Sequence, residues 1–280
     1  MKFIKALRGC LAIVYAISHL FIVTFPGFLI AVLLAALTSR GNGTTFRNRL
    51  VWHTTGHGAL LFWILRGILG VEANIQLLAQ VALLERRASG ASQSLIVIAN
   101  HQSIIDILIV CTVMWRLRHT SLRWILKVSL RWTPFGIVAW LSRCGFVRRQ
   151  REKGQEDLAA VALCGKQAFQ DNATVVIFPE GTRFTGKVQG SEFEHLRRPK
   201  QGGFRTLLAQ MPEAGVLSIA IHWSGGARGE GFGRTFWDGL DFVGRRLDVR
   251  AEYIPRAVID ADSSWLNTHW HERDLLLADA

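Results

Sequence analysis

"LIVIANHQSIIDILIV", residues 95–110, has the pattern of a buried strand, a polar turn and the start of a helix. Residues 95–99 are apolar and rich in β-branched side chains, which is typical of a strand covered on both faces. The apolar segment that follows, 103–117, has the length of a helix. His101 and Asp106 lie at this junction, so a polar pair stands at the edge of a hydrophobic core.

The alternation of strands and helices continues along the chain. Apolar runs predict strands at 173–181 and 214–223, and longer segments predict helices at 122–142 and 154–171. Such alternation predicts an α/β fold with a mostly parallel central sheet flanked by helices. We expect residues 72–280 to form this domain, with the glycine-rich stretch 225–233 as a loop.

The N-terminal segment has a different composition. Its uncharged run, from Gly9 to Ser39, exceeds the about 20 residues that a membrane-spanning helix requires. Pro26 and Gly27 interrupt the run, and they predict a kink or the tip of a re-entrant pair. A cleaved signal peptide is the alternative, but no convincing cleavage site ends the run. We therefore expect residues 1–71 to form a membrane anchor followed, over 44–71, by an interfacial amphipathic helix.

The overall composition limits the function. The chain has 280 residues, a net charge of +12, 50% hydrophobic residues and only 19% charged residues. A basic and apolar chain suggests anionic partners, either lipids or charged substrates. Nucleic acid is not expected, because no recognised nucleic-acid-binding motif is present. The four cysteines are scattered, so neither a disulfide framework nor a cysteine metal site is expected.

The pair His101 and Asp106 can meet only in one arrangement. Five residues rotate by about 140° along a helix, so the two side chains would not share a helical face. They meet if His101 lies in the loop and Asp106 in the first helical turn, with Ser103 as N-cap. Asp106 then either caps its own helix or orients His101 for deprotonation of a hydroxyl group. Ser103 as the nucleophile of a lipid hydrolase is the alternative, although no Gly-x-Ser-x-Gly motif surrounds it.

A second polar turn ends the strand in "VVIFPEGTRF", residues 175–184. Gly181 allows a sharp turn that exposes backbone N–H groups, and Thr182 and Arg183 offer donors suited to a phosphate. Glu180 could accept a hydrogen bond from a polyol hydroxyl; a simple strand-ending turn is the alternative reading. Residues 107–151 carry several basic side chains and no acidic one, which favours a surface for phosphates or anionic lipid.

Together these stretches resemble the glycerolipid acyltransferase family, of the 1-acyl-sn-glycerol-3-phosphate acyltransferase type. "NHQSIID", "GFVRR" and "FPEGTRF" are similar to the first three sequence blocks of that family, in the same order. "LRRPKQGGF", residues 196–204, resembles a segment of the lysocardiolipin-acyltransferase-like subgroup. The fourth block differs, because "VLSIAIHW" lacks the proline common in the family.

The resemblance implies a site and a reaction. His101 would act as general base on the free hydroxyl of a lysophospholipid, and Asp106 would orient it. The hydroxyl would attack the thioester of acyl-CoA or acyl carrier protein directly, without a cofactor or a metal. The residues implied to hold the acceptor are Arg149, Glu180, Gly181, Thr182 and Arg183, with Lys200 as an addition.

The resemblance also implies a substrate and a location. The expected acceptor is 1-acyl-sn-glycerol 3-phosphate, which gives phosphatidic acid; the alternative is a remodelling enzyme for a different head group. The expected location is the bacterial inner membrane, with the active site facing the cytoplasm.

Overall fold

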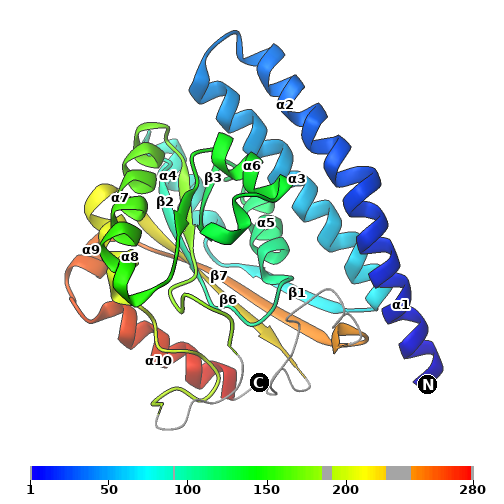
Figure 1. Ribbon diagram of the computed structural model, residues 1–280. Helices are drawn as coiled ribbons and strands as arrows, with labels where there is room; N and C mark the ends of the chain where they lie inside the picture. Colours follow the sequence, from blue (N-terminus) through cyan, green and yellow to red (C-terminus); the bar gives the residue numbers. More distant parts are fainter. Residues whose placement is uncertain (1, 91, 185–190, 225–240, 279–280) are drawn as a thin grey trace.

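Seven strands form one sheet in the computed structural model, which describes residues 2–90, 92–184, 191–224 and 241–278 (Figure 1). The strands are β1 (Glu72–Leu77), β2 (Leu95–Ala99), β3 (Leu122–Lys127), β4 (Gly145–Val147), β5 (Thr174–Ile177), β6 (Gly215–Trp223) and β7 (Arg246–Ile254). Their order is β1-β7-β6-β2-β5-β3-β4, and only β6 and β7 pair antiparallel. The predicted α/β class with a mostly parallel sheet is confirmed.

Helices cover both faces of the sheet (Figure 1). Their bounds are α4 (Gln80–Ala88), α5 (Asp106–Arg116), α6 (Pro134–Leu141), α7 (Gly154–Gln170), α8 (Gln201–Gln210), α9 (Arg256–Asp260) and α10 (Trp265–Ala278). Short 3-10 helices, η2 (Val128–Leu130) and η3 (Arg151–Lys153), precede α6 and α7.

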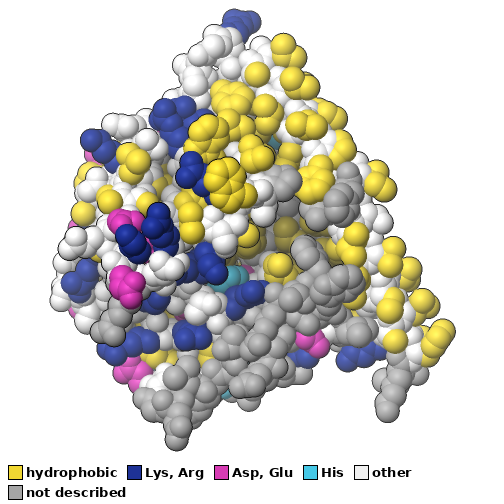
Figure 2. Space-filling model, in the orientation of Figure 1, with side chains coloured by type: hydrophobic (Ala, Val, Ile, Leu, Met, Phe, Trp, Pro, Cys, Tyr) yellow, Lys and Arg dark blue, Asp and Glu magenta, His cyan; other side chains and the backbone are white. Residues whose placement is uncertain are grey.

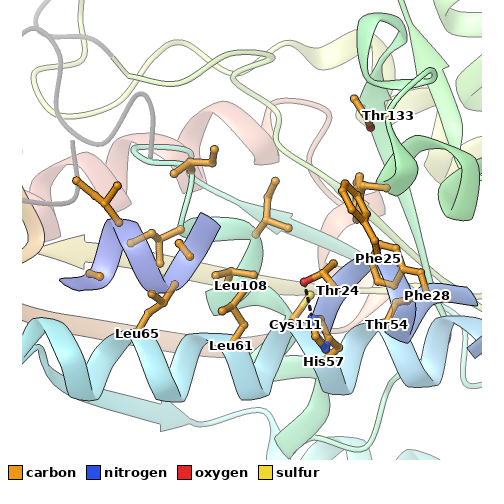
Figure 3. Close-up of a pocket in the computed structure, with 18 of the residues that line it drawn as sticks. Thr24, Phe25, Phe28, Thr54, His57, Leu61, Leu65, Leu108, Cys111 and Thr133 are labelled. Atoms are coloured by element: carbon orange, nitrogen blue, oxygen red, sulfur yellow. Dashed lines mark hydrogen bonds between the residues drawn. The ribbon is translucent and has the colours of Figure 1, made fainter. Parts of the chain in front are cut away.

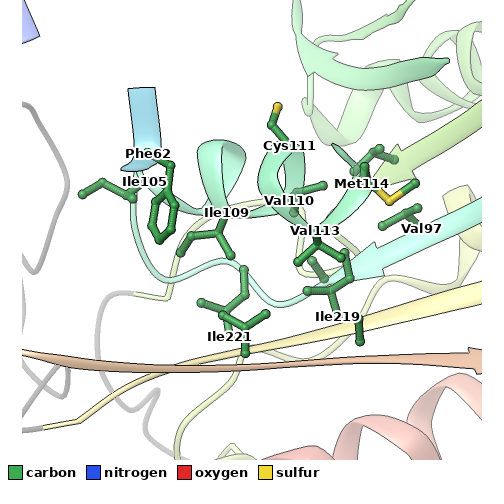
Figure 4. Packing of buried hydrophobic residues seen from close by; sticks show 14 of the residues in the cluster. Phe62, Val97, Ile105, Ile109, Val110, Cys111, Val113, Met114, Ile219 and Ile221 are labelled. Carbon is green, nitrogen blue, oxygen red and sulfur yellow. The ribbon is translucent and has the colours of Figure 1, made fainter. Parts of the chain in front are cut away.

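Strand β2 divides the hydrophobic core into two layers. Val97 joins a cluster that includes α5 and part of β6, while Ile96 and Ile98 join the opposite cluster with α7, α8 and α10. Figure 4 shows part of the first layer, in which Ile219 and Ile221 lie below the apolar side chains of α5. Because successive side chains of a strand point to opposite faces, both layers require β2 to be continuously apolar.

One predicted helix was wrong. The segment 122–142 contains β3, η2 and α6, because its first six residues pair with β5 and β4. Thr133 and Pro134 then begin α6, with the Thr133 hydroxyl accepting from the Gly136 N–H. A long apolar run cannot distinguish one buried helix from a buried strand followed by a helix. Strands β1, β4 and β7 were also missed, since they are short or exposed on one side. The loop predicted at 225–233 lies outside the described residues.

The N-terminal segment forms a long helical hairpin (Figure 1). Helix α1 (Lys2–His19), the π-helical turn η1 (Leu20–Thr24) and α2 (Phe25–Ser39) follow one another without a break. Of the two alternatives for Pro26 and Gly27, a kink or the tip of a re-entrant pair, the tip is wrong, because Pro26 lies in the first turn of α2, where its missing N–H costs little. The chain instead reverses after Ser39 into α3 (Gly43–Leu69), whose N-terminus is capped by the Asn42 side chain.

Helix α3 fixes this hairpin to the sheet domain. A Cβ at Gly56 would lie 2.6 Å from the Trp115 ring, and one at Gly58 would lie 3.0 Å from the Cys111 sulfur. The two glycines therefore let α3 pack closely against α5. Residues 3–39 are long and apolar enough to cross a membrane, a test that a signal sequence also passes. The division into domains at residues 71 and 72 stays a prediction, although α3 ends and β1 begins there.

Candidate active site

His101 lies directly beyond the carboxyl end of β2, in a turn that Asn100 holds in place. The Asn100 side chain donates to the Ile221 carbonyl and accepts from the Ile221 N–H, both at 2.8 Å. These two bonds join the end of β2 to the end of β6. The next residue, His101, is therefore placed at the edge of the sheet where ligands bind in open α/β folds.

The predicted pair His101 and Asp106 is in contact. His101 Nδ1 lies 3.0 Å from Asp106 Oδ2, and Asp106 is the first residue of α5. The same Oδ2 accepts the backbone N–H groups of Gln102 and Ser103, at 2.6 and 2.7 Å. Asp106 is fully buried, whereas the His101 side chain is 14% exposed. With Nδ1–H donating to this carboxylate, Nε2 remains as the base.

Ser103 does not have the predicted capping role. Helix α5 begins at Asp106, and the residue before it makes no side-chain cap. The Ser103 hydroxyl instead donates to Asp106 Oδ1 at 2.7 Å and is buried. Its proton is therefore engaged by the carboxylate and not by His101, which disfavours Ser103 as a nucleophile.

The turn after β5 packs against the His101 turn. The Phe178 ring stacks on the His101 ring, with centroids 4.2 Å apart. The Phe184 N–H donates to the His101 carbonyl at 2.7 Å. Residues 178–184 therefore hold both the ring and the backbone of His101. This contact explains why the blocks "NHQSIID" and "FPEGTRF" occur together.

Glu180 is a buried link between two backbone segments. Its carboxyl oxygens accept the N–H of His101 at 2.9 Å and the N–H of Arg197 at 3.1 Å. Burial raises the pKa of the Glu180 carboxyl to about 8, and these two hydrogen bonds oppose the shift. Because both oxygens are occupied, Glu180 is better suited to holding His101 than to the predicted contact with a polyol hydroxyl.

A polar cavity of about 630 Å³ lies beside this turn. It brings together three of the predicted binding residues, Arg149, Gly181 and Lys200, which come from separate segments. Phe178, which stacks on His101, also lines it. Gly181 has φ +71°, and a Cβ there would lie 3.1 Å from Lys200 Nζ. The backbone angle therefore favours glycine at this turn, and the Lys200 side chain packs closely against it.

Arg149 is held at the cavity wall by an acidic partner. The Asp157 carboxylate of α7 accepts hydrogen bonds from the backbone N–H groups of Arg148 and Arg149, at 2.7 and 2.8 Å. Burial lowers the pKa of the Arg149 guanidinium, and Asp157 opposes that shift. Thr182 and Arg183 follow Gly181 but do not line this cavity, so their roles stay predictions.

A second, apolar cavity of about 430 Å³ was missed by sequence reasoning (Figure 3). Its walls come from α1, η1, α2, α3 and α5, which are far apart in the chain. Ile104 and Ile105, just after His101, lie at its wall. In its wall, Thr24 Oγ1 lies 3.0 Å from His57 Nε2. No local motif predicts such a cavity, because it forms only when these helices pack.

The part of the chain that the structure describes contains no group of three or more His, Cys, Asp or Glu side chains that could hold a metal ion. Its free cysteines lie in or near hydrophobic packing, apart from the exposed Cys10.

Comparisons with known proteins identify the family of this chain. The family model described as Acyltransferase matches residues 79–222, more than half of the chain. The fold resembles the crystal structure of the 1-acyl-sn-glycerophosphate (LPA) acyltransferase PlsC from Thermotoga maritima, with a TM-score of 0.61 and 17% identity. That match covers 98% of this chain and 95% of the other. No curated protein matches the sequence. The chain therefore belongs to the acyltransferase family and is an enzyme of that type.

Proposed function

We propose that this enzyme transfers a fatty acyl group from a thioester donor, acyl-CoA or acyl carrier protein, to the free hydroxyl of a lysophospholipid. The observation that carries the proposal is the contact of His101 Nδ1 with Asp106, which leaves Nε2 as a base. This pair lies between a cavity whose wall carries Arg149 and Lys200, which suit a phosphate, and an apolar cavity suited to an acyl chain. That combination matches an amphipathic acceptor with a charged head group.

The residues divide the reaction between them. His101 Nε2 takes the proton of the acceptor hydroxyl while the oxygen attacks the thioester carbonyl. The carbon–sulfur bond then breaks, and the imidazolium returns the proton to the leaving thiolate. The buried Asp106 carboxylate stabilises the imidazolium formed between these steps. The exchange balances without a cofactor or a metal.

The head group would lie in the polar cavity. Arg149 and Lys200 supply positive charge there, and the turn at Gly181 brings the backbone close. A phosphate bound by these groups gains charge-assisted hydrogen bonds. We therefore propose 1-acyl-sn-glycerol 3-phosphate as the acceptor, which is also the substrate named for the Thermotoga protein. A lysophospholipid with a different head group is the alternative, because the "LRRPKQGGF" segment resembles the lysocardiolipin-acyltransferase-like subgroup.

The acyl chain would lie in the apolar cavity. The residues of α3 that line it run from Thr54 to Leu69, a length of about 22 Å at 1.5 Å per residue. That length suits the long acyl chain of the acceptor, with its glycerol end near Ile104, beside the His101 turn.

The enzyme would associate with one leaflet of the membrane. Helices α1 and α2 pack along α3, and α3 packs against α5 of the sheet domain. A helix fixed along the domain in this way suits immersion in the membrane surface better than a crossing of the bilayer. The outward side chains of α1 and α2 are large and apolar, from Phe3 to Leu37. A position on the cytoplasmic leaflet of the bacterial inner membrane gives access to both acyl donors.

An acyl-transfer assay tests the proposal. Purified protein is offered a panel of lysophospholipids with each donor type, and the products are identified by mass spectrometry. Acylation of lysophosphatidic acid alone supports the narrow assignment, and acylation of several head groups supports a remodelling enzyme. Absence of transfer to every acceptor would contradict the proposal.

A further inference from the structure

Three large apolar side chains are exposed on α6 and in the turn just before it. Trp132, Ile137 and Trp140 are 86, 53 and 56% exposed, and we call them the α6 tip patch. Ile137 and Trp140 are three residues apart and share a helical face. Monomeric proteins seldom expose such a group of side chains without a partner.

The surroundings of the patch are basic. Arg131 places its guanidinium 5.9 Å from the centre of the Trp132 ring, and Lys127 is exposed nearby in sequence. Residues 107–151 contain no acidic residue at all. Figure 2 shows hydrophobic side chains over the region of α6, with Lys and Arg side chains next to them. A surface that binds a protein partner ordinarily carries both acidic and basic side chains. Tryptophan bordered by basic residues alone suits an anionic lipid surface instead.

The patch is continuous with the helical hairpin. On its inner side, Val138 packs with Ala31 and Ala35 of α2 and with Leu50 of α3. Figure 2 shows apolar side chains on α6 and along α1 and α2 in the same view. The α6 tip is therefore held rigidly relative to the outward apolar side of α1 and α2.

The same helix borders the apolar cavity. Thr133 and Phe135, at the start of α6, line it together with Phe25 and Phe28 of α2, and Figure 3 shows Phe25 between α2 and Thr133. An acyl chain moving from a leaflet into the cavity could pass here without leaving an apolar environment. We propose that the α6 tip patch binds an anionic leaflet and forms the point where acyl chains pass from the bilayer into the cavity.

This inference rests on the proposed acyl transfer, so its test separates binding from catalysis. The variant Trp132→Ala/Trp140→Ala is compared with wild type for flotation with phosphatidylcholine vesicles, with and without phosphatidylglycerol. Acyl transfer is then measured with a lysolipid in the vesicles and with a short-chain, monomeric lysolipid. The control variant Leu163→Ala/Val258→Ala removes two side chains, 57 and 49% exposed, from α7 and α9.

We expect the tryptophan variant to lose about tenfold in vesicle binding and in transfer to the vesicle acceptor. Transfer to the monomeric acceptor stays within about twofold, and the control variant behaves as wild type in both assays. Lys127→Gln/Arg131→Gln should reduce the gain in binding that phosphatidylglycerol gives to wild type.

Equal vesicle binding by the tryptophan variant and wild type would overturn the inference. Equal loss with both acceptors would also overturn it, because the patch would then support the site itself. If wild type transferred no acyl group to either acceptor, the proposed function would fail, while flotation would still decide whether the patch binds lipid.

Discussion

The polar cavity and the apolar cavity lie on either side of the His101 turn, yet they are built in different ways. The polar cavity has Arg149 and Gly181 in the turns that follow β4 and β5, each within a short sequence block, and α7 and α8 complete its wall. The apolar cavity is formed by helix faces, and its lining residues range from Ala12 to Phe242. Chemistry that depends on local turns can be read from motifs, whereas a binding volume between helices depends on packing across the whole chain.

The largest effect is expected at the residue between the two cavities. His101→Ala removes the base, and general acid–base catalysis contributes about 10²- to 10⁴-fold, so kcat should fall by a factor in that range. Neither cavity changes, so acceptor binding should persist. Steady-state kinetics and isothermal titration with lysophosphatidic acid check both points. A variant with near-normal kcat would remove His101 from the chemistry.

A smaller loss of activity is expected from a change at Glu180, which holds the backbone of His101. Glu180→Gln places an amide NH₂ against the N–H of His101 or of Arg197, so one of the two hydrogen bonds is lost. We expect kcat to fall about 10- to 100-fold with little change in KM, since one buried hydrogen bond is worth about 1–3 kcal/mol. Glu85→Gln, an exposed change on α4 outside both cavities, is the control. A rise in KM alone would indicate that Glu180 contacts the acceptor directly.

The proposed role of the polar cavity in binding the phosphate can be tested by removing one of its positive charges. Lys200→Ala should raise KM for lysophosphatidic acid about tenfold, because a charge-assisted contact with phosphate is lost. An acceptor without a phosphate, such as a monoacylglycerol, should be affected less. Kinetics with the two acceptors provide the measurement. Equal changes in KM for both would place the phosphate elsewhere.

The apolar cavity can be reduced without touching the polar one. Ala16 lines it. Ala16→Leu should shift the preference of the enzyme toward acceptors with shorter acyl chains, by several-fold in kcat/KM. Ala36→Leu, on the exposed side of α2, is the control. Competition among acyl chains of graded length, analysed by mass spectrometry, measures the shift. An unchanged chain-length profile would assign the acyl chain to another place.

The smallest effect concerns stability and pH. Burial raises the pKa of the Glu180 carboxyl from its ordinary 4.5 to about 8 in the folded protein, so its neutral form favours folding. This contribution is complete below about pH 4.5 and is lost as the pH rises through about 8. The free energy of unfolding of wild type should therefore fall relative to Glu180→Gln across that interval. Denaturant titrations at several pH values measure the difference, and a parallel pH dependence would contradict the assignment.

The sequence predicted the parts of this molecule that depend on neighbouring residues. The strand over 95–99, the turn with His101 and Asp106, and the helix after it are all specified within one block. The helix predicted over 122–142 failed, because a strand in a buried sheet has no periodicity that separates it from a helix. The role of Ser103 was also predicted incorrectly, since only the folded turn shows that its hydroxyl donates to Asp106.

Long-range features could not be predicted for a different reason. Pro26, which interrupts the apolar N-terminal run in the sequence, lies in the first turn of α2, where a missing N–H costs little. The hydrogen bond from the Arg197 backbone N–H to the Glu180 carboxylate joins two sequence blocks, and neither block specifies it alone. The apolar cavity requires α1, α2, α3 and α5 together. Each of these depends on where separate segments meet.

A double-mutant cycle on His101 and Asp106 tests most directly that the two residues act as one catalytic unit. The acyl-transfer rates of His101→Ala, Asp106→Asn and the double variant are compared with wild type, using lysophosphatidic acid and acyl-CoA. If Asp106 acts only through His101, as their 3.0 Å contact indicates, the double variant should be no slower than the slower single variant. Losses that multiply in the double variant would show that the two residues act independently and would contradict the proposed mechanism.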